Sequence, residues 1–426
     1  MRLQAVKGTH DILPEQIPSW RSVRDAVAKT LERAGVHEIS TPIFEHSEVF
    51  TKSVGESADL VVQKEMYTFE DRGGRSLTLR PEFTAGVLRS FIENGMHTRP
   101  TPVKLWSIGP VFRAENVQRG RFRQFHQVNC EILGLSGPLV DAESIALLYR
   151  SLEACGLVGL TVKLGSVGDP EDRAAYNDYL RGELEPRSAD LSETSRTRLA
   201  VNPMRILDAK DERDQVLIEN LKRPLDFLGE AAREHFEALQ GYLRDWRIPF
   251  GIDPGIVRGL DYYRRTAFEI HHGGIGAQSA LCGGGRYDGL IETLGGPATP
   301  GIGWAFGVER VLDAMTKNGV QLPSPAAPDL FLVPLDDEAV AEVARTAAGL
   351  RDRFHVEHAY VRRNVGKGLR DANRSGARFA GLRGTEERTA GIYRIKQLAS
   401  GEQHDIQEGE LGRLLAGELA APLENR

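Results

Sequence analysis

Cysteine is scarce in this sequence, with only Cys130, Cys155 and Cys282 among 426 residues. Three thiols so widely scattered exclude a disulfide framework and a zinc knuckle, and they favour a reducing compartment, so we expect a cytoplasmic protein. A run of about 18 or more apolar residues is also lacking, and Met1–Pro14 carries charged side chains where a signal peptide would need an apolar core. We therefore expect a chain that is neither exported nor membrane-spanning.

The chain also lacks a large net charge. Its formal value is −6, and 41% hydrophobic with 27% charged residues is ordinary for a globular protein with two or three cores, so bulk attraction to nucleic acid is not expected. The charge is unevenly distributed, however, because Arg345–Lys396 holds 13 Lys or Arg against 5 Asp or Glu, an excess of 8. A second basic stretch runs from Arg113 to Arg123. Either stretch is a solvated face or an anion-binding surface.

The first part of the chain has the pattern of an antiparallel sheet with packed helices. Apolar residues in Gln16–Ala34 recur on one helical face, and Gly35 is placed to end that helix. Alternating runs separated by short polar or glycine-containing turns predict two β-hairpins. The hairpins are Glu65–Phe69 with Ser76–Arg80 and Val103–Arg113 with Arg121–Leu133, and a helix over Glu82–Glu93 lies between them.

A helical insertion interrupts this pattern. Asp141 is placed to cap a helix that runs to Cys155, and Leu160–Ser166 follows as a strand. From about 168 to 246 the sequence changes to charged, helix-like segments. We expect the strands beyond it to complete the same sheet, so the first domain is α+β. The expected later elements are helices over Asp211–Leu221 and Leu228–Leu243, strands from Phe250 and over Tyr262–His271, Ala277–Cys282 and Gly301–Gly307, and a helix from Val308.

Prolines between Thr316 and Pro328 mark a linker. Beyond it, short strands alternate with helices, which predicts a small α/β domain with a largely parallel or mixed sheet. The sequence thus predicts a first domain over 1–321, a linker over 322–328 and a second domain over 329–426. The expected elements of the second domain are strands Leu330–Pro334, Val356–Val361, Arg378–Leu382 and Gly391–Lys396, and helices Glu338–Arg353 and Gly366–Ser375.

One predicted strand carries a row of polar side chains. Alternation puts Gln127, Asn129 and Glu131 on one face. Arg121 shares their parity, and Arg113 lies on the paired strand of the hairpin. This face is either exposed to solvent or the wall of a binding site. Clustered guanidinium groups suit phosphate oxygens, so ATP is a natural candidate ligand.

Two segments are dense in glycine, Cys282–Tyr287 (CGGGRY) and Gly301–Arg310 (GIGWAFGVER). Glycine at this density indicates tight turns or a close approach of the backbone to a ligand. Neither segment has the glycine spacing of a P-loop or a dinucleotide-binding turn.

Several segments stand in an order that is more specific than any one of them. Thr41–Glu45 (TPIFE) resembles the first motif of class II aminoacyl-tRNA synthetases, and Gly301–Arg310 resembles the third. The second motif is matched by Arg80–Gly86 (RPEFTAG), Gly109–Glu115 (GPVFRAE) and Phe125–Gln127 (FHQ).

Other segments resemble the histidyl-tRNA synthetase family in particular. Arg258–Tyr263 (RGLDYY) and Leu281–Asp288 (LCGGGRYD) are similar to its two histidine-specific motifs, and Lys7–Pro14 (KGTHDILP) is similar to its N-terminus. Gly368–Asn373 and Gly376–Ala380 resemble its anticodon-binding domain. The resemblance implies a class II catalytic domain built on an antiparallel sheet, with the helical insertion, followed by a small α/β anticodon-binding domain.

The resemblance also implies an activity and its partners. The family activates L-histidine with ATP to histidyl-adenylate and transfers it to the 3′ end of histidine tRNA in protein synthesis. It works as a homodimer through the first motif, and it uses Mg²⁺ with ATP. The sequence has no dedicated metal cage, so the ion is expected to be carried by the phosphates, and no protein-bound metal is expected.

Roles for individual residues follow from the matched motifs. Arg113 would hold the α-phosphate of ATP, Arg310 the γ-phosphate end, and Arg121 with Glu115 would place the nucleotide. Arg258 would approach the reacting carboxylate and the α-phosphate from the other side, as a fixed cation. Positioning and electrostatics suffice for this chemistry, and no protein nucleophile is needed.

The resemblance also assigns a pocket for the amino acid. Glu131 and Tyr263 would hydrogen-bond the two imidazole nitrogens, and a pocket that satisfies both rejects amino acids lacking them. Gln118 and Arg119 would meet the acceptor end of the tRNA, while the basic C-terminal domain would bind the anticodon. The remaining pocket residues are Glu82, Thr84 and Gln127, which would receive the α-ammonium group, and Tyr262 and Tyr287, which would line the pocket.

Some residues depart from the family pattern or have simpler explanations. Phe83 stands where the family has a small residue, and the bulky Trp304 is expected in the core. His271 and His272 beside Glu269 are either metal ligands or structural, and adjacent strand residues pointing to opposite faces favour the structural interpretation. His126 and Cys282 are likewise expected to be packed side chains.

Two other functions fit parts of the pattern. One is a non-charging, synthetase-like regulatory subunit of ATP phosphoribosyltransferase, but such relatives lack the anticodon domain and several of the site residues found here. The other is a class II synthetase for another amino acid, against which the segment Arg258–Tyr263 argues. The histidine-charging enzyme is therefore the prediction.

Overall fold

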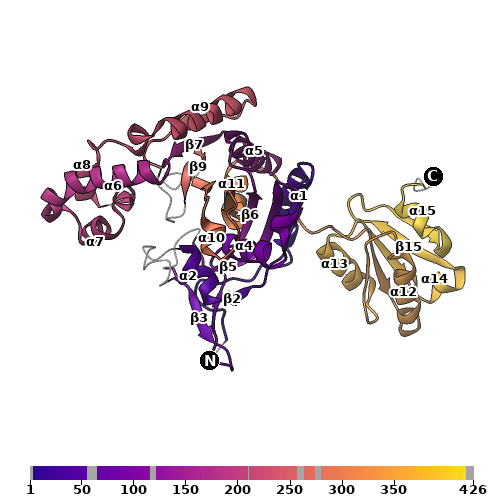
Figure 1. The fold of residues 1–426 in the computed structure, drawn as a ribbon. Helices are drawn as coiled ribbons and strands as arrows, with labels where there is room; N and C mark the ends of the chain where they lie inside the picture. The colour runs from indigo at the N-terminus through magenta and orange to yellow at the C-terminus, as the bar shows by residue number, and fades with distance from the viewer. Residues whose placement is uncertain are drawn as a thin grey trace. The chain divides into compact units, whose positions relative to one another are not determined.

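The computed structural model describes residues 3–54, 65–115, 121–209, 211–256, 263–273 and 280–418 (Figure 1). The chain divides into two compact units, Met1–Ser324 and Pro325–Arg426. Each unit is described by itself below. Among the described residues, no helix is both long enough and apolar enough to cross a membrane.

An eight-stranded sheet forms the centre of the first unit, in the order β1-β5-β6-β11-β10-β9-β7-β8. Every neighbouring pair from β5 to β7 is antiparallel, and only the two edge strands, β1 and β8, pair in parallel. The antiparallel prediction is therefore confirmed. The strands are β1 (His37–Glu38), β5 (Val103–Phe112), β6 (Gln124–Leu133), β7 (Leu160–Ser166), β8 (Phe250–Ile252), β9 (Arg264–His272), β10 (Ala280–Arg286) and β11 (Gly301–Gly307).

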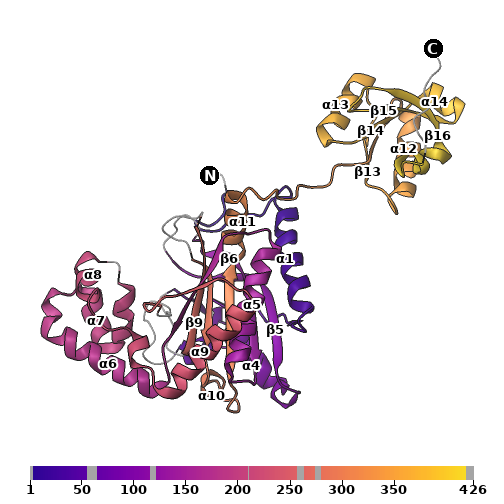
Figure 2. The same cartoon turned by 90° about the horizontal axis from the view of Figure 1, so that it is seen from above.

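Four helices cover one face of this sheet: α1 (Ile17–Glu32), α5 (Pro138–Ala154), α9 (Glu230–Asp245) and α11 (Val308–Lys317) (Figures 1 and 2). Their apolar side chains form one core with the inward residues of the strands. In α1 that stripe is Val23, Val27 and Leu31, all fully buried, as its helical spacing predicts. The even-numbered residues Val128, Cys130 and Ile132 of β6 lie in the same core, so its odd-numbered residues face the other way.

The opposite face is covered by α4 (Thr84–Glu93) and α10 (Leu290–Thr293), with the 3-10 turn Met96–Thr98. Beside it, a three-stranded sheet in the order β2-β4-β3 contains the predicted first hairpin. Strand β2 pairs with β4 as well, so Phe44 lies opposite Leu79. These elements are β2 (Phe44–His46), β3 (Tyr67–Glu70), β4 (Ser76–Leu79) and the helix α2 (Ser47–Val54).

The inserted helices have a core of their own, which includes Tyr176, Leu180 and Ile206. Helix α9 does not join that core, because its apolar side chains pack with α5 against the large sheet. The expected insertion over about 168–246 thus divides at about Gly229. Its own elements are α6 (Pro170–Leu184), α7 (Glu193–Val201), α8 (Glu212–Ile218) and the 3-10 turns Glu185–Asp190, Pro203–Asp208 and Pro224–Phe227.

The predicted cap of α5 is wrong. The helix begins at Pro138 after Gly137, and Asp141 lies within its first turn. The Asp141 side chain is fully buried and pairs with Arg286 of β10. A carboxylate is attracted more strongly to a buried guanidinium than to backbone N–H groups, so the tertiary pairing overrides the capping preference.

The second unit holds a five-stranded mixed sheet in the order β13-β12-β14-β15-β16. Strands β13, β12 and β14 are parallel, whereas β15 and β16 add as an antiparallel edge, so the predicted mixed sheet is confirmed. The sequence analysis missed α14, β16 and α15. The elements are β12 (Leu330–Pro334), α12 (Asp337–Leu350), β13 (Val356–His358), α13 (Val365–Ser375), β14 (Phe379–Arg383), α14 (Thr385–Ala390), β15 (Ile392–Gln397), β16 (Gln403–Gln407), the 3-10 turn Glu408–Glu410 and α15 (Leu411–Leu415).

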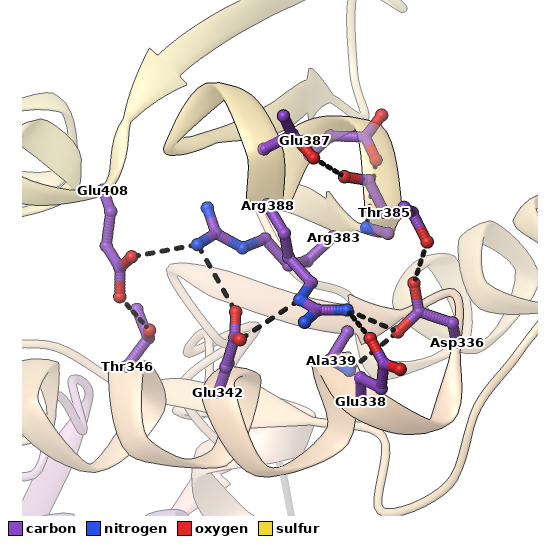
Figure 3. A network of polar contacts seen from close by, with 12 residues as sticks. Asp336, Glu338, Ala339, Glu342, Thr346, Arg383, Thr385, Glu387, Arg388 and Glu408 are labelled. Carbon is purple, nitrogen blue, oxygen red and sulfur yellow. Dashed lines mark hydrogen bonds and ion pairs between the residues drawn. The ribbon is translucent and has the colours of Figure 1, made fainter.

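An ion-pair network fastens α14 to α12 in this unit (Figure 3). Arg388 of α14 reaches Glu338 at 2.6 Å and Glu342 at 3.1 Å. The nearly buried Arg383 also pairs with Glu342, at 3.5 Å, and with Glu408 at 3.2 Å. Two arginines thus share one carboxylate, which couples the end of β14 to two helices.

Candidate active site

The polar row predicted on β6 lies inside the protein. Gln127 is 8% exposed, Asn129 1% and Glu131 0%, so the solvent-facing interpretation of this strand does not hold. Their even-numbered neighbours fill the helix-covered core, which leaves the odd-numbered side chains on the face where α4 lies. Buried polar groups need hydrogen-bond partners, and a row of three in one strand therefore indicates a binding site.

Glu131 has protein partners on both carboxylate oxygens. Asn129 Nδ2 donates to Oε1 at 2.8 Å, and the Tyr287 hydroxyl donates to Oε2. Burial raises the pKa of Glu131 to about 7, against the hydrogen bonds from Asn129, Thr84 and Tyr287, which lower it. A carboxyl group poised near neutrality can present an acceptor to a ligand N–H deep in the protein.

The glycine-rich segments are explained by the side chains that surround Glu131 and by those of two tyrosines. Strand register places Gly303 opposite Glu131, and a Cβ on Gly303 would lie 1.8 Å from Glu131 Oε2. A Cβ on Gly301 would lie 2.4 Å from the Tyr287 ring, and one on Gly285 would lie 2.6 Å from the Tyr263 ring. Of the two alternatives for these segments, tight turns do not apply, because these glycines lie within β10 and β11, where they leave room for the side chains of Glu131, Tyr287 and Tyr263.

Thr84 and Glu82 stand at the start of α4. Glu82 accepts backbone N–H bonds from Thr84 and Ala85, so it caps the helix, and burial raises its pKa. Thr84 Oγ1 accepts from Asn129 Nδ2 at 3.3 Å, which joins the helix start to the β6 row. Within the described part of the chain, Gln127 Oε1 is buried without a hydrogen-bond partner. It is an acceptor suited to a ligand cation such as an ammonium group.

Arg80 ties the first predicted motif to the second. Its guanidinium donates to Thr41 O at 2.8 Å and to Pro110 O at 2.9 Å, and it stacks on the ring of Phe83 at 4.1 Å. Burial lowers the pKa of Arg80 to about 10. Phe83 itself is buried in the apolar cluster around α4. The large Phe83 side chain, which stands where the family has a small residue, is therefore accommodated by packing in this apolar cluster.

Three arginines gather beside the β6 row. Arg113 donates through Nε to Pro81 O at 2.9 Å, and Arg310 donates to Ala280 O at 3.0 Å. Arg121 pairs with Glu115 at 3.2 Å. Burial lowers the pKa of Arg310, and the positive charges of Arg121 and Arg113 lower it further. Glu115 and Glu269 act in the opposite direction. A polyanionic ligand would relieve the repulsion among the three arginines.

The histidines singled out by sequence have separate structural partners. The backbone N–H of His126 donates to Glu309 at 2.8 Å, and its ring packs edge-on against Trp20. His271 contacts Glu269 at 2.9 Å, whereas His272 contacts Asn318 at 2.8 Å. In the described ranges, no group of three or more His, Cys, Asp or Glu side chains is arranged to hold a metal ion.

The remaining departure, Trp304, and the expected packed residue Cys282 are both buried. Trp304 is buried and stacks on Phe306 in the helix-covered core, as expected. Cys282 is also a buried thiol, like Cys130 and Cys155.

Four predicted site residues lie outside the described residues. They are Arg258 and Tyr262 of the RGLDYY segment, and Gln118 and Arg119 of the loop between β5 and β6. Tyr263, at the edge of the first segment, is described and packs against Gly285. Among the described residues, the structure brings together predicted pocket residues from β6, from the start of α4 and from the end of β10, and it brings Arg113 and Arg121 close to Arg310.

Asn129 and Tyr287 have larger roles in the site than their sequence patterns predict. Asn129 joins Thr84 to Glu131, and its alternation with Glu131 was a usable signal for a role in the site. Tyr287 was expected only to line the pocket, but its hydroxyl holds Glu131, 156 residues away in sequence. No local pattern encodes that contact.

Comparison with known proteins agrees with this geometry. A family model described as histidyl-tRNA synthetase matches residues 8–311, and one described as anticodon binding domain matches residues 329–417. The chain belongs to the histidyl-tRNA synthetase family. Among curated members, the histidine–tRNA ligase of Thermus thermophilus is 54% identical over 413 residues, covering 96% of this chain and 98% of that protein. The enzyme of Deinococcus radiodurans is 50% identical over 430 residues, covering 98% and 100%.

Solved structures place the fold in the same family. Apo histidyl-tRNA synthetase of S. aureus superimposes with a TM-score of 0.82 at 35% identity, covering 97% of this chain and 100% of that one. A Bacillus halodurans protein titled ATP phosphoribosyltransferase regulatory subunit/histidyl-tRNA synthetase has a TM-score of 0.64 at 22% identity, with 90% and 98% covered. The second likeness concerns the fold alone. The high-identity relatives support the histidine–tRNA ligase assignment of this class II synthetase, not the regulatory alternative.

Proposed function

We propose that the pocket on β6 is where this histidyl-tRNA synthetase activates L-histidine with ATP, before the amino acid is transferred to histidine tRNA. The observation that carries the proposal is Glu131, a fully buried carboxyl group held by Asn129 and Tyr287, with a pKa of about 7. Such an acceptor at the base of a polar pocket suits an imidazole N–H, and the family membership makes histidine the amino acid.

The pocket offers a complementary set of groups for histidine. Glu131 and Tyr263 would hydrogen-bond the two ring nitrogens, and Gln127 Oε1 with Glu82 and Thr84 would receive the α-ammonium group. Tyr287 would hold the Glu131 carboxyl group in position for the imidazole, and Tyr262 would line the pocket. An amino acid without both ring nitrogens would leave the buried Glu131 without the hydrogen bond that histidine donates, and a lost hydrogen bond to a buried charged group costs about 1–3 kcal/mol.

The arginine cluster is the proposed site for the ATP phosphates. Arg113 would contact the α-phosphate and Arg310 the γ-phosphate end, while Arg121 and Glu115 would place the nucleotide. Support comes from the lowered pKa of Arg310, which reflects burial and repulsion by Arg121 and Arg113. Bound phosphates would relieve this repulsion.

The chemistry needs no protein nucleophile. The carboxylate of histidine attacks the α-phosphorus, the bond to the β-phosphate oxygen breaks, and pyrophosphate leaves. Negative charge grows at the α-phosphoryl oxygens, where Arg113 and, from the other side, Arg258 would stabilise it. The residues of the chain thus bind the two substrates, align the reacting groups and neutralise the negative charge of the phosphates.

Magnesium fits this site as a companion of ATP. Glu115 and Glu269 are carboxylates close enough to Arg310 for their charges to raise its pKa. These are hard oxygen donors, which Mg²⁺ accepts together with phosphate oxygens. When bound, the ion would neutralise phosphate charge beside the arginines.

Contacts with tRNA are proposed at two places. Gln118 and Arg119 would meet the acceptor end, and the C-terminal unit would bind the anticodon, as its family match implies. On that unit Tyr360 is 78% exposed, and the basic residues Arg362 and Lys367, which follow it within seven residues of the sequence, are exposed as well. An exposed aromatic ring among basic side chains suits stacking of a splayed base beside phosphates.

We further propose the assembly, the domain limits and the location of the enzyme. Residues 1–321 would form the catalytic domain, 322–328 a linker and 329–426 the anticodon-binding domain, in a cytoplasmic protein. A homodimer through the first motif is supported by Ile43, Phe44 and Phe69, large apolar side chains that are 44%, 53% and 45% exposed on the small sheet.

The activity is tested by ATP–pyrophosphate exchange with each of the twenty amino acids. Exchange with histidine alone is expected, and Arg113→Met and Arg258→Ala should abolish it. A matched control is Arg388→Met, which removes an arginine from the network of the C-terminal unit and should leave exchange unchanged (Figure 3). Charging of bulk bacterial tRNA with labelled histidine follows. No exchange with any amino acid would contradict the proposal, and exchange with a different one would contradict the histidine pocket.

A further inference from the structure

A buried ion pair behind the pocket has no part in the function proposed above. Asp141 of α5 and Arg286 of β10 are both 0% exposed and pair with each other. Arg286 Nε donates to Asp141 Oδ2 at 3.3 Å and Nη2 donates to Oδ1. The Thr266 hydroxyl and His235 Nε2 also contact Asp141 Oδ2, at 2.5 and 2.8 Å. The Asp141 side chain therefore connects α5 to three other elements, α9, β9 and β10. We call this group of contacts the junction.

This junction sits at an irregularity of the sheet. In the ladder between β9 and β10, Gly285 pairs with Ala267 but Arg286 pairs with Arg264, so two residues of β9 are skipped. The skipped residues are Arg265, which has a φ of +51°, and Thr266. A bulge interrupts the ladder hydrogen bonds that would otherwise hold both strands in place. Because Thr266 and Arg286 both bind Asp141, that carboxylate joins the two strands where the ladder is interrupted.

Strand β10 ends at Arg286, and the next residue along the chain is Tyr287, which contacts Glu131. Tyr287 follows Arg286 and precedes Asp288, and Arg286 Nη1 donates to Asp288 Oδ1 at 2.9 Å. Asp288 Oδ1 also accepts from the Gly301 N–H at 3.1 Å, while the Tyr287 N–H donates to Gly301 O at 2.8 Å. Tyr287 is thus held by its own backbone hydrogen bond to Gly301 and by the hydrogen bonds of its two sequence neighbours, Arg286 and Asp288. From there its hydroxyl reaches Glu131.

The same network determines which ring nitrogen of His235 carries the hydrogen. Arg265 Nη1 donates to His235 Nδ1 at 3.4 Å, so Nδ1 is the acceptor and Nε2 carries the hydrogen that is donated to Asp141. Arg265 binds Asp169, at the start of α6, at 2.8 and 2.9 Å. The bulge is therefore held from the side of the helical insertion as well.

The geometry points to Asp141, Arg286 and Asp288 as positioning residues that fix Tyr287, and through its hydroxyl the carboxylate of Glu131, for recognition of the histidine imidazole. None of the three touches the proposed substrate. The inference rests on the proposed function, because it assigns Glu131 to the imidazole. Its signature is a loss of histidine affinity with ATP affinity retained.

The test measures histidine binding by calorimetry, without ATP, and the KM values for histidine and ATP in pyrophosphate exchange. Tyr287→Phe is the benchmark, because it removes only the hydroxyl that holds Glu131. Asp141→Asn and Asp288→Ala are expected to weaken histidine binding about tenfold or more, as a lost hydrogen bond to a charged group does, with the KM for ATP changed less than about twofold.

A combined variant separates positioning from general damage. If Asp288 acts through Tyr287, Asp288→Ala with Tyr287→Phe should bind histidine no more weakly than Tyr287→Phe alone. Additive losses would overturn the inference. Arg383→Met is the matched control, since it removes a nearly buried, ion-paired guanidinium from the other unit and should leave histidine binding unchanged.

If Asp141→Asn does not fold, Asp288→Ala still tests the role of the network. The Asp288 side chain is 26% exposed, and its removal leaves the buried pair of Asp141 and Arg286 intact. A folded Asp288→Ala protein with unchanged histidine affinity would overturn the inference while wild-type binding upholds the proposed function. Absence of histidine binding by the wild type would instead overturn the proposed function.

Discussion

Replacing Glu131 by glutamine should stabilise the protein at high pH while destroying its activity. Burial raises the pKa of Glu131 from 4.5 to about 7 in the folded protein. The carboxyl group thus loses its proton more readily in the unfolded chain than in the folded protein. Its contribution favours folding below pH 4.5 and is lost as the pH rises towards 7. A neutral amide carries no such dependence.

The magnitude follows from these two pKa values. Each pH unit between them corresponds to about 1.4 kcal/mol, so above pH 7 the ionised carboxylate costs the folded state about 3 kcal/mol, and at pH 5 below about 1 kcal/mol. The glutamine amide can keep the local bonds, because Asn129 can turn its side chain and accept from the new NH₂ group with Oδ1, for which the described residues offer no other partner.

Thermal unfolding of wild type and Glu131→Gln at pH 5 and pH 8, without ligands, measures this effect. We expect a higher Tm for the variant at pH 8 and nearly equal values at pH 5, together with loss of histidine-dependent pyrophosphate exchange. Asn129→Ala is a suitable comparison, since it disturbs the same hydrogen bonds without removing the charge. A variant less stable at pH 8, or equally stabilised at both pH values, would refute the reasoning.

Four further predictions concern the same sites. The KM for histidine should rise as the pH falls below about 7, because the protonated carboxyl group of Glu131 is a weaker acceptor for the imidazole N–H than the carboxylate, and an unchanged KM from pH 8 to 6 would count against this. Gly303→Ala, whose Cβ would lie 1.8 Å from Glu131 Oε2, should weaken histidine binding at least tenfold in calorimetry, whereas Gly349→Ala, with open space around it, should not. Arg310→Met should raise the KM for ATP ten- to a hundredfold in pyrophosphate exchange and leave histidine binding intact; equal losses for both substrates would contradict its phosphate role. Tyr360→Ala should raise the KM for tRNA about tenfold in charging assays, as loss of one stacked base does, without changing pyrophosphate exchange.

The sequence alone determined the features that depend on neighbours along the chain. The stripe Val23, Val27 and Leu31 is a local periodicity that specified a helix and its buried face. The alternation around Glu131 specified a strand but left open whether its polar face meets solvent or a binding site. The order of the motif segments indicated the family, and the structure brings Arg113, Arg121 and Arg310 together as expected. The roles of Arg258, Tyr262, Gln118 and Arg119 stay predictions, because these residues lie outside the described ranges.

Only the tertiary structure decided the contacts between elements far apart in sequence. Asp141 has the sequence context of a helix cap, but a buried guanidinium 145 residues away takes its carboxylate. The density of glycine in β10 and β11 left tight turns and close approach open, and the structure shows that these glycines accommodate the side chains of Glu131, Tyr263 and Tyr287. Periodicity and propensity describe one segment at a time, whereas the partner of a buried charge and the space beside a glycine depend on which strands the folded sheet places side by side.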